Sequence, residues 1–132
     1  MKARKRILVV DDEVRLAYLL RQSLLTVDPD YEIETAHTAQ DALASIDREP
    51  FDLVVTDCRM DGMGGLELLR AIKTHRPDTL VILMTAFGSE EIAAEAERWK
   101  AYRYITKPFP IEDFQCIVRE ALRSRTDVAR YA

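Results

Sequence analysis

The stretch Phe51-Asp52-Leu53-Val54-Val55-Thr56-Asp57 decides the fold of this chain. Apolar and β-branched residues dominate it, which is typical of a buried strand, and it ends on the carboxylate of Asp57. Residues 58–65 follow as a loop whose three glycines would let the backbone turn closely around whatever Asp57 binds. The rest of the chain repeats this layout, because polar residues also stand at the ends of other predicted strands.

Strand-like and helical segments alternate along the chain. The predicted strands are residues 7–10, 31–36, 51–57, 80–84 and 101–105. The predicted helices cover residues 14–25, 39–46, 66–75, 90–98 and 114–122, with Thr38 and Ser89 as N-caps. Near-continuous apolar strands separated by helices imply a parallel sheet covered on both faces. We therefore expect an α/β fold, a doubly wound sheet of five parallel strands with five helices, and a functional edge at the carboxyl ends of the strands.

Length and composition predict one ordinary globular domain. The chain has 132 residues, of which 48% are hydrophobic and 32% charged, which is enough for one hydrophobic core. A net charge of -4 gives no electrostatic basis for binding nucleic acid or an anionic membrane. The basic start is followed by an apolar run too short for a secretory signal, and no later run reaches membrane-spanning length. A cytoplasmic location is therefore predicted.

The cysteines and histidines predict no site of their own. Cys58 and Cys116 lie far apart without metal-ligand spacing, so both are expected to be reduced thiols. His37 and His75 have no partner at ligand or catalytic spacing.

Polar residues that follow four of the predicted strands carry the chemistry. They are Asp11 and Asp12 after the first strand, Asp57 after the third, Thr85 after the fourth and Lys107 after the fifth. Three carboxylates share a small site only with a cation, and a hard oxygen-binding ion such as Mg²⁺ would offset their repulsion. Lys107 adds a positive charge and Thr85 a hydroxyl, the groups that hold phosphoryl oxygens during transfer. The edge is therefore predicted to bind Mg²⁺ and phosphate, with Asp57 as the nucleophile that forms an acyl phosphate.

At these residues the sequence resembles the receiver domains of two-component response regulators. The resemblance rests on the acidic run 11–13, Asp57 with Met60 three residues on, Thr85-Ala86, and Tyr104-Ile105-Thr106-Lys107-Pro108-Phe109. Each piece alone is weak, and the set is specific because the pieces occur in order, each at its strand end. The resemblance implies the flavodoxin-like strand order 2-1-3-4-5. It also implies a single receiver domain over residues 1–132, with a core at about 6–122 and a polar helical tail or linker start at 123–132.

The resemblance implies a role for each acidic residue. Asp57 would accept a phosphoryl group from a histidine kinase or a phosphotransfer protein. Asp12 and Asp57 would bind Mg²⁺ directly and Asp11 mainly through water. The backbone carbonyl of Arg59 would complete the protein ligands.

The resemblance also implies a switch. Lys107 and Thr85 would contact the phosphoryl group, and the Lys107-Pro108 peptide bond would be cis. Thr85 would move toward the phosphoryl group while Tyr104 turns inward, changing the surface made by the fourth helix, the fifth strand and the fifth helix. Partners that the resemblance allows are a second copy bound through this surface, an output domain or a protein target. Neither direct contact with nucleic acid nor a membrane is expected.

Two positions beside the predicted phosphate site suggest control of the acyl phosphate lifetime. Arg59 stands two residues after Asp57, and Phe87 stands two residues after Thr85. We hypothesise that the two side chains crowd the path of the hydrolytic water and lengthen the lifetime.

The sequence departs from the family pattern at several loop positions. Asp61 stands where the family usually has proline, and Lys100 stands where it usually has glycine before the fifth strand. These departures bear on loop conformation and on partner choice, and the expected fold does not depend on them.

Two other function classes remain open from the sequence. A Mg²⁺-dependent phosphatase with an aspartyl nucleophile would usually need a second carboxylate two residues after Asp57, and that residue is Arg59. The chain is thus expected to catalyse only its own phosphorylation and dephosphorylation and not to be an enzyme. A phosphate-independent interaction module would be favoured by loss of Asp57, Thr85 or Lys107, and all three are present.

Overall fold

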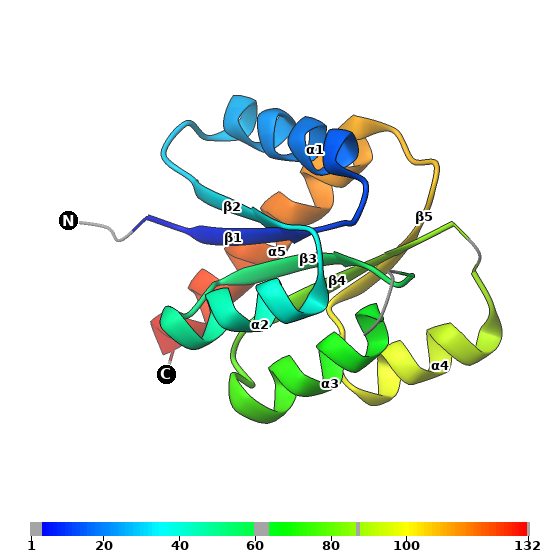
Figure 1. The fold of residues 1–132 in the computed structure, drawn as a ribbon. Helices are drawn as coiled ribbons and strands as arrows, with labels where there is room; N and C mark the ends of the chain where they lie inside the picture. Colours follow the sequence, from blue (N-terminus) through cyan, green and yellow to red (C-terminus); the bar gives the residue numbers. More distant parts are fainter. Residues whose placement is uncertain (1–3, 60–63, 87, 132) are drawn as a thin grey trace.

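Strands and helices alternate along the whole of the described chain. The computed structural model describes residues 4–59, 64–86 and 88–131. Its elements are β1 (Arg6–Val10), α1 (Val14–Val27), β2 (Glu32–Ala36), α2 (Ala39–Arg48), β3 (Leu53–Asp57), α3 (Gly65–His75), β4 (Leu80–Thr85), α4 (Glu90–Arg98), β5 (Arg103–Thr106) and α5 (Ile111–Tyr131). Figure 1 shows how these elements are arranged around the sheet.

The strands form one parallel sheet in the order β2-β1-β3-β4-β5, which confirms the predicted fold. In the sheet register Val10 lies opposite Thr56, and Asp57 lies opposite Met84. Because all the strands run in the same direction, their carboxyl ends meet at one edge of the sheet, on the right of Figure 1. The residues that follow the strands are therefore brought together there.

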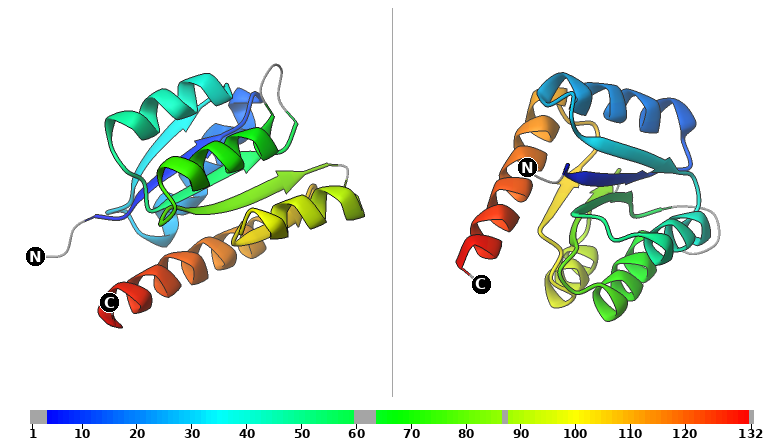
Figure 2. Two further views of the ribbon diagram at one scale, coloured as in Figure 1. Left: turned by 90° about the horizontal axis from the view of Figure 1, so that it is seen from below. Right: turned by 90° about the vertical axis from the view of Figure 1, so that its left-hand side faces the viewer.

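Helices cover both faces of the sheet and close two hydrophobic cores. Figure 2 shows α1 and α5 on one side of the sheet and α2, α3 and α4 on the other. Along β1 the side chains alternate between these cores: Ile7 and Val9 pack on the side of α1 and α5, and Leu8 and Val10 on the opposite side. All four are fully buried, as expected for a central strand of a two-faced parallel sheet.

Two helices begin at side-chain caps that the sequence predicts. The Thr38 hydroxyl oxygen accepts a hydrogen bond of 3.0 Å from the Asp41 N–H at the start of α2. The Ser89 hydroxyl oxygen accepts one of 3.1 Å from the Ile92 N–H at the start of α4. Each bond satisfies a backbone donor that the first helical turn leaves unpaired, so the caps fix where these helices begin.

Some element boundaries differ from the predicted ones for identifiable reasons. Phe51 precedes β3, and its buried ring lies 4.5 Å below the guanidinium of Arg6. Lys100 has a positive φ of 60°, and the Ala101 N–H donates to the Ala96 carbonyl at 2.9 Å. The left-handed conformation of Lys100 ends the helical path of α4, and β5 therefore begins only at Arg103. Among the described residues no helix is both long and apolar enough to cross a membrane.

Candidate functional site

The carboxyl edge of the sheet gathers three carboxylates. Asp11 follows β1, Asp12 comes next in the chain, and Asp57 is the last residue of β3. One carboxylate oxygen from each of the three lies within 4.8 Å of the others. Asp12 is exposed, whereas Asp57 is 9% exposed and Asp11 is fully buried. The edge thus holds a compact acidic cluster with one side open to solvent.

Asp11 is fixed through both its backbone and its side chain. Its N–H donates a hydrogen bond of 3.0 Å to the Ala36 carbonyl at the end of β2. Its Oδ1 accepts one of 2.9 Å from the Glu13 N–H, and its Oδ2 lies 3.0 Å from the ammonium nitrogen of Lys107. A buried carboxylate without such partners would be strongly unfavourable, so these contacts hold the Asp11 side chain in place.

Lys107 connects the acidic groups to the end of β5. Its Nζ lies 3.3 Å from Oδ2 of Asp57 as well as 3.0 Å from Asp11. Burial lowers the pKa of Lys107, but its hydrogen bond to Asp11 and the charges of the two carboxylates outweigh this and raise the pKa overall. The side chain therefore stays a cation at neutral pH, and it stands between two anions.

The surroundings of Asp57 favour binding of a proton or a metal cation to its carboxylate. Burial is the largest cause of its raised pKa, and the negative charge of Asp11 adds to it, while Lys107 acts in the opposite direction. The Arg59 N–H approaches Oδ1 of Asp57 at 3.4 Å. Three carboxylates and one ammonium leave an excess of negative charge, which a bound divalent cation would neutralise.

The donor set fits Mg²⁺. Mg²⁺ prefers carboxylate oxygens and keeps several waters, and here two buried carboxylates stand beside one that is exposed to solvent. No thiol or imidazole nitrogen belongs to the acidic cluster among the described residues. The residues therefore suit a hard cation and not a soft one.

The last strands and the loop after β3 shape the same edge. Thr85, at the end of β4, is fully buried, and its carbonyl accepts a hydrogen bond of 2.7 Å from the Lys107 N–H. The Lys107-Pro108 peptide bond is cis, as the resemblance implies. A Cβ at residue 65 would collide with the Asp57 carbonyl oxygen and lie 2.8 Å from Cα of Cys58. Glycine at position 65 thus lets α3 begin directly against the backbone of β3.

Tyr104 lies inward on the side of α2, α3 and α4. Its half-buried ring packs against the core on that side. Its hydroxyl oxygen is buried and has no hydrogen-bond partner among the described residues. A Cβ on Gly88 would lie 2.6 Å from that oxygen, so the ring occupies space that only a glycine at position 88 leaves open.

Comparison with known proteins decides the family. The model of the response regulator receiver domain matches residues 7–119. The chain belongs to the response regulator receiver domain family. Receiver domains are signalling modules of two-component systems.

The receiver's relatives include longer regulators. It is 35% identical to the response regulator protein PilR of Pseudomonas aeruginosa, over 98% of this chain and 29% of that protein. It is 40% identical to the transcriptional regulatory protein ZraR of Salmonella typhimurium, over 88% of this chain and 26% of that protein. The chain thus spans between a quarter and a third of the length of these relatives.

Solved receiver domains share the fold of this chain. A CheY-like receiver domain protein from Methanospirillum hungatei superimposes with a TM-score of 0.90 at 33% identity, covering 95% of this chain and 98% of that one. The receiver domain of NtrX from Brucella abortus superimposes with a TM-score of 0.80 at 37% identity, covering 89% and 98%. The five-stranded order 2-1-3-4-5 is therefore the family's fold.

The receiver brings most of the predicted site residues together. The acidic cluster, Lys107 and the end of β4 with Thr85 all lie at the carboxyl edge. Arg59 contributes a backbone N–H to Asp57, and its side chain is exposed. Phe87, Met60 and Asp61 lie outside the described residues.

The sequence-based interpretation missed His37. Its Nδ1 lies 3.0 Å from the carbonyl oxygen of Asp11, at the carboxyl edge of the sheet. The signal was its place directly after β2, where the other predicted site residues also follow their strands.

Cys58 and Cys116 are free, as expected. Burial raises the pKa of the Cys58 thiol to about 11, and the negative charge of Asp57 adds to this. The thiol beside Asp57 is therefore protonated and unreactive at neutral pH.

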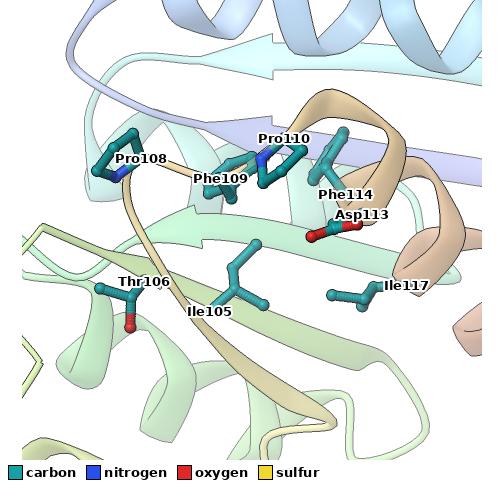
Figure 3. A pocket seen from close by; sticks show the side chains of 8 residues that line it. All are labelled: Ile105, Thr106, Pro108, Phe109, Pro110, Asp113, Phe114 and Ile117. Carbon is teal, nitrogen blue, oxygen red and sulfur yellow. The ribbon is translucent and has the colours of Figure 1, made fainter.

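A separate pocket lies beside β5 and α5. Its volume is about 290 Å³, and Figure 3 shows side chains from β5, from the connection after it and from α5 around it. Phe109 and Phe114 stack there with ring centroids 5.8 Å apart. No member of the acidic cluster lines this pocket.

Proposed function

We propose that this receiver domain takes a phosphoryl group onto Asp57 from a histidine kinase or a phosphotransfer protein, with Mg²⁺ as cofactor. One observation carries the proposal: three carboxylates meet within 4.8 Å, and the Lys107 ammonium lies 3.3 Å from the carboxylate of Asp57. An anionic nucleophile, a cation site and a fixed ammonium are the parts that phosphoryl transfer requires.

The metal would be held by residues around the open side of the cluster. Asp12 and Asp57 would bind it directly, Asp11 mainly through water, and the Arg59 backbone carbonyl would complete the protein ligands. When bound, Mg²⁺ would neutralise phosphoryl oxygens and draw them toward the acceptor carboxylate.

Asp57 acts as the nucleophile. One of its carboxylate oxygens attacks the phosphorus, and a new O–P bond forms an acyl phosphate. The bond between phosphorus and the donor's imidazole nitrogen breaks, and its electron pair returns to the imidazole. Lys107 stabilises the charge on the transferred group because its ammonium already stands beside the acceptor.

The switch follows from the new charge at Asp57. Thr85 moves toward the phosphoryl group, and its hydroxyl donates to a phosphoryl oxygen. Tyr104 then occupies the inward position, and this movement changes the surface made by α4, β5 and α5. The phosphoryl group acts by shifting population toward a state that already exists. The inward position of Tyr104 in this structure supports that account.

Two neighbours tune how long the phosphoryl group stays. In this proposal the Arg59 side chain and Phe87, which lies outside the described residues, would hinder the approach of the water that hydrolyses the acyl phosphate. Replacing both with alanine should shorten the lifetime in proportion to the water access gained. Equal lifetimes in the variant and the parent would contradict this role.

The partners follow from the family. The domain works in the cytoplasm as a single receiver, and its switched surface engages a second copy, an output domain or a protein target. The longer relatives PilR and ZraR support an attached output domain. The catalysis is limited to the domain's own phosphorylation and dephosphorylation.

Beryllofluoride, a stable mimic of the phosphoryl group, tests the proposal through backbone amide shifts. Wild type should show Mg²⁺-dependent shifts at Asp57 that extend to Thr85 and Tyr104, and Asp57→Asn should show none of them. The similar receiver domain described as the BeF3-activated DrrB supports the use of this mimic. No response to Mg²⁺ or to the mimic in wild type would instead favour a phosphate-independent interaction module.

A further inference from the structure

We propose that His37 is a positioning residue for the metal site, because its side chain fixes the peptide that connects Asp11 to Asp12. This inference rests on the proposed function of the acidic cluster. It assigns a role to a residue that does not belong to the acidic cluster itself.

Only one direction is possible for the hydrogen bond between His37 and Asp11. Nδ1 of His37 lies 3.0 Å from the Asp11 carbonyl oxygen. A carbonyl oxygen accepts hydrogen bonds and cannot donate, so Nδ1 carries the proton and donates it. The imidazole is half-buried, which protects this bond from competition by water.

The histidine is itself held firmly. It stands between Ala36, the last residue of β2, and Thr38, the N-cap of α2. The Ala36 carbonyl accepts the Asp11 N–H at 3.0 Å, and the Thr38 side chain accepts the Asp41 N–H at 3.0 Å. The imidazole therefore extends from a rigid junction, and its bond transmits that rigidity to Asp11.

The orientation matters most for Asp12. The Asp11 carbonyl and the Asp12 nitrogen belong to one planar peptide unit, so fixing the carbonyl fixes the direction in which the chain enters Asp12. Within the described parts of the chain, the Asp12 carboxylate is exposed and forms no hydrogen bond or ion pair. Backbone orientation is thus what aims this carboxylate at the shared cation site.

A Mg²⁺ titration followed by the amide shifts of Asp12 and Asp57 measures the effect. His37→Ala should raise the Mg²⁺ dissociation constant about three- to tenfold, the change expected from losing one hydrogen bond. His37→Asn should stay near wild type, because its side-chain amide can donate from nearly the same place as Nδ1. His75→Ala, at the exposed end of α3, is the matched control and should leave the constant unchanged.

The outcomes separate the two proposals. An unchanged constant in His37→Ala, or an equal loss in the Ala and Asn variants, would overturn the positioning role while wild-type binding upholds the metal site. Wild type that binds no Mg²⁺ would overturn both. The ¹⁵N shifts of the His37 ring test the role without any variant: they should show a protonated Nδ1, and a bare Nδ1 would overturn it.

Discussion

The ammonium nitrogen of Lys107 lies 3.0 Å from Oδ2 of Asp11, although 96 positions separate the two residues in the sequence. The two strands that deliver them, β1 and β5, are not neighbours in the sheet. Asp11 is fully buried, and Lys107 is the cation that the described structure places against it. This pair therefore stabilises the acidic edge before any metal binds.

Replacing Lys107 with methionine removes that cation and leaves the Asp11 charge buried without it. We expect the free energy of unfolding without Mg²⁺ to fall by about 3 kcal/mol, the scale for breaking a buried ion pair. Mg²⁺ should restore part of the loss. Urea unfolding with and without Mg²⁺ measures both, and the double variant Asp11→Asn/Lys107→Met should lose less than the sum of the single variants. Simple additivity would show that the two residues do not interact.

Replacing Asp57 with asparagine should stabilise the metal-free domain at neutral pH. Burial raises the pKa of Asp57 above its ordinary value of 3.8, so the unfolded chain ionises this carboxyl at a lower pH than the folded state does. The folded state therefore loses stability as the pH rises through the interval between the pKa of the unfolded chain and that of the folded state. Asp57→Asn escapes the loss, and we expect a gain of about 1 kcal/mol near pH 7, the size of a typical single-residue effect.

The gain should shrink as the pH falls toward about 4, the ordinary carboxyl range, because the folded state takes up the Asp57 proton at a higher pH than the unfolded chain does. Excess Mg²⁺ at neutral pH should reverse the ranking, because the cation binds and stabilises wild type. Urea midpoints at the two pH values provide the measurement. A gain that is the same at both pH values would show that the charge of Asp57 is not its cause.

Replacing Gly88 with alanine should displace the Tyr104 ring. The added Cβ would lie 2.6 Å from the Tyr104 hydroxyl oxygen, and an overpacked contact of this kind costs about 1 kcal/mol or more. Tyr104→Phe should stabilise the domain by about 1 kcal/mol, because it removes a buried hydroxyl that has no partner among the described residues.

The double variant Gly88→Ala/Tyr104→Phe is the decisive control for that contact. Phenylalanine lacks the clashing oxygen, and the next ring atom, Cζ, would lie 3.7 Å from the new Cβ, an ordinary contact. The ring should therefore return inward, which ¹³C-labelled aromatic resonances would report. If Gly88→Ala lowers the stability of the wild type and of Tyr104→Phe equally, the clash does not involve the Tyr104 hydroxyl.

Replacing Lys100 with glycine should stabilise the end of α4. Lys100 has a φ of 60°, a conformation that costs a residue with a side chain about 1 kcal/mol. The glycine variant should gain roughly that amount in thermal or urea unfolding and leave Mg²⁺ affinity unchanged. Lys100→Ala is the matched control, since alanine shares the backbone strain. If Lys100→Ala gains as much stability as Lys100→Gly, the effect comes from removing the lysine charge and not from relieving the backbone.

Much of the fold could be predicted from the sequence because its determinants are local and periodic. The strand ending at Asp57 is buried on both faces, and a continuous apolar run encodes that directly. The parallel arrangement then places Asp11, Asp57, Thr85 and Lys107 at one edge without further information. The site composition was accessible for the same reason.

The remaining features depend on distances between segments that the sequence does not encode. The contact of His37 with Asp11 joins residues 26 positions apart, and no spacing rule connects an imidazole to a backbone carbonyl. The space for the Tyr104 hydroxyl is decided by the missing Cβ of Gly88. Such contacts follow from how β2, β4 and β5 pack, and only the folded chain shows them.

Intact mass spectrometry after incubation with acetyl phosphate tests the central claim most directly. Wild type with Mg²⁺ should gain the mass of one phosphoryl group, and removing Mg²⁺ with a chelator should prevent the gain. Asp57→Asn should gain nothing, although its fold and the rest of the acidic edge persist. An equal gain in wild type and Asp57→Asn, or no gain in wild type with Mg²⁺, would contradict phosphorylation at Asp57.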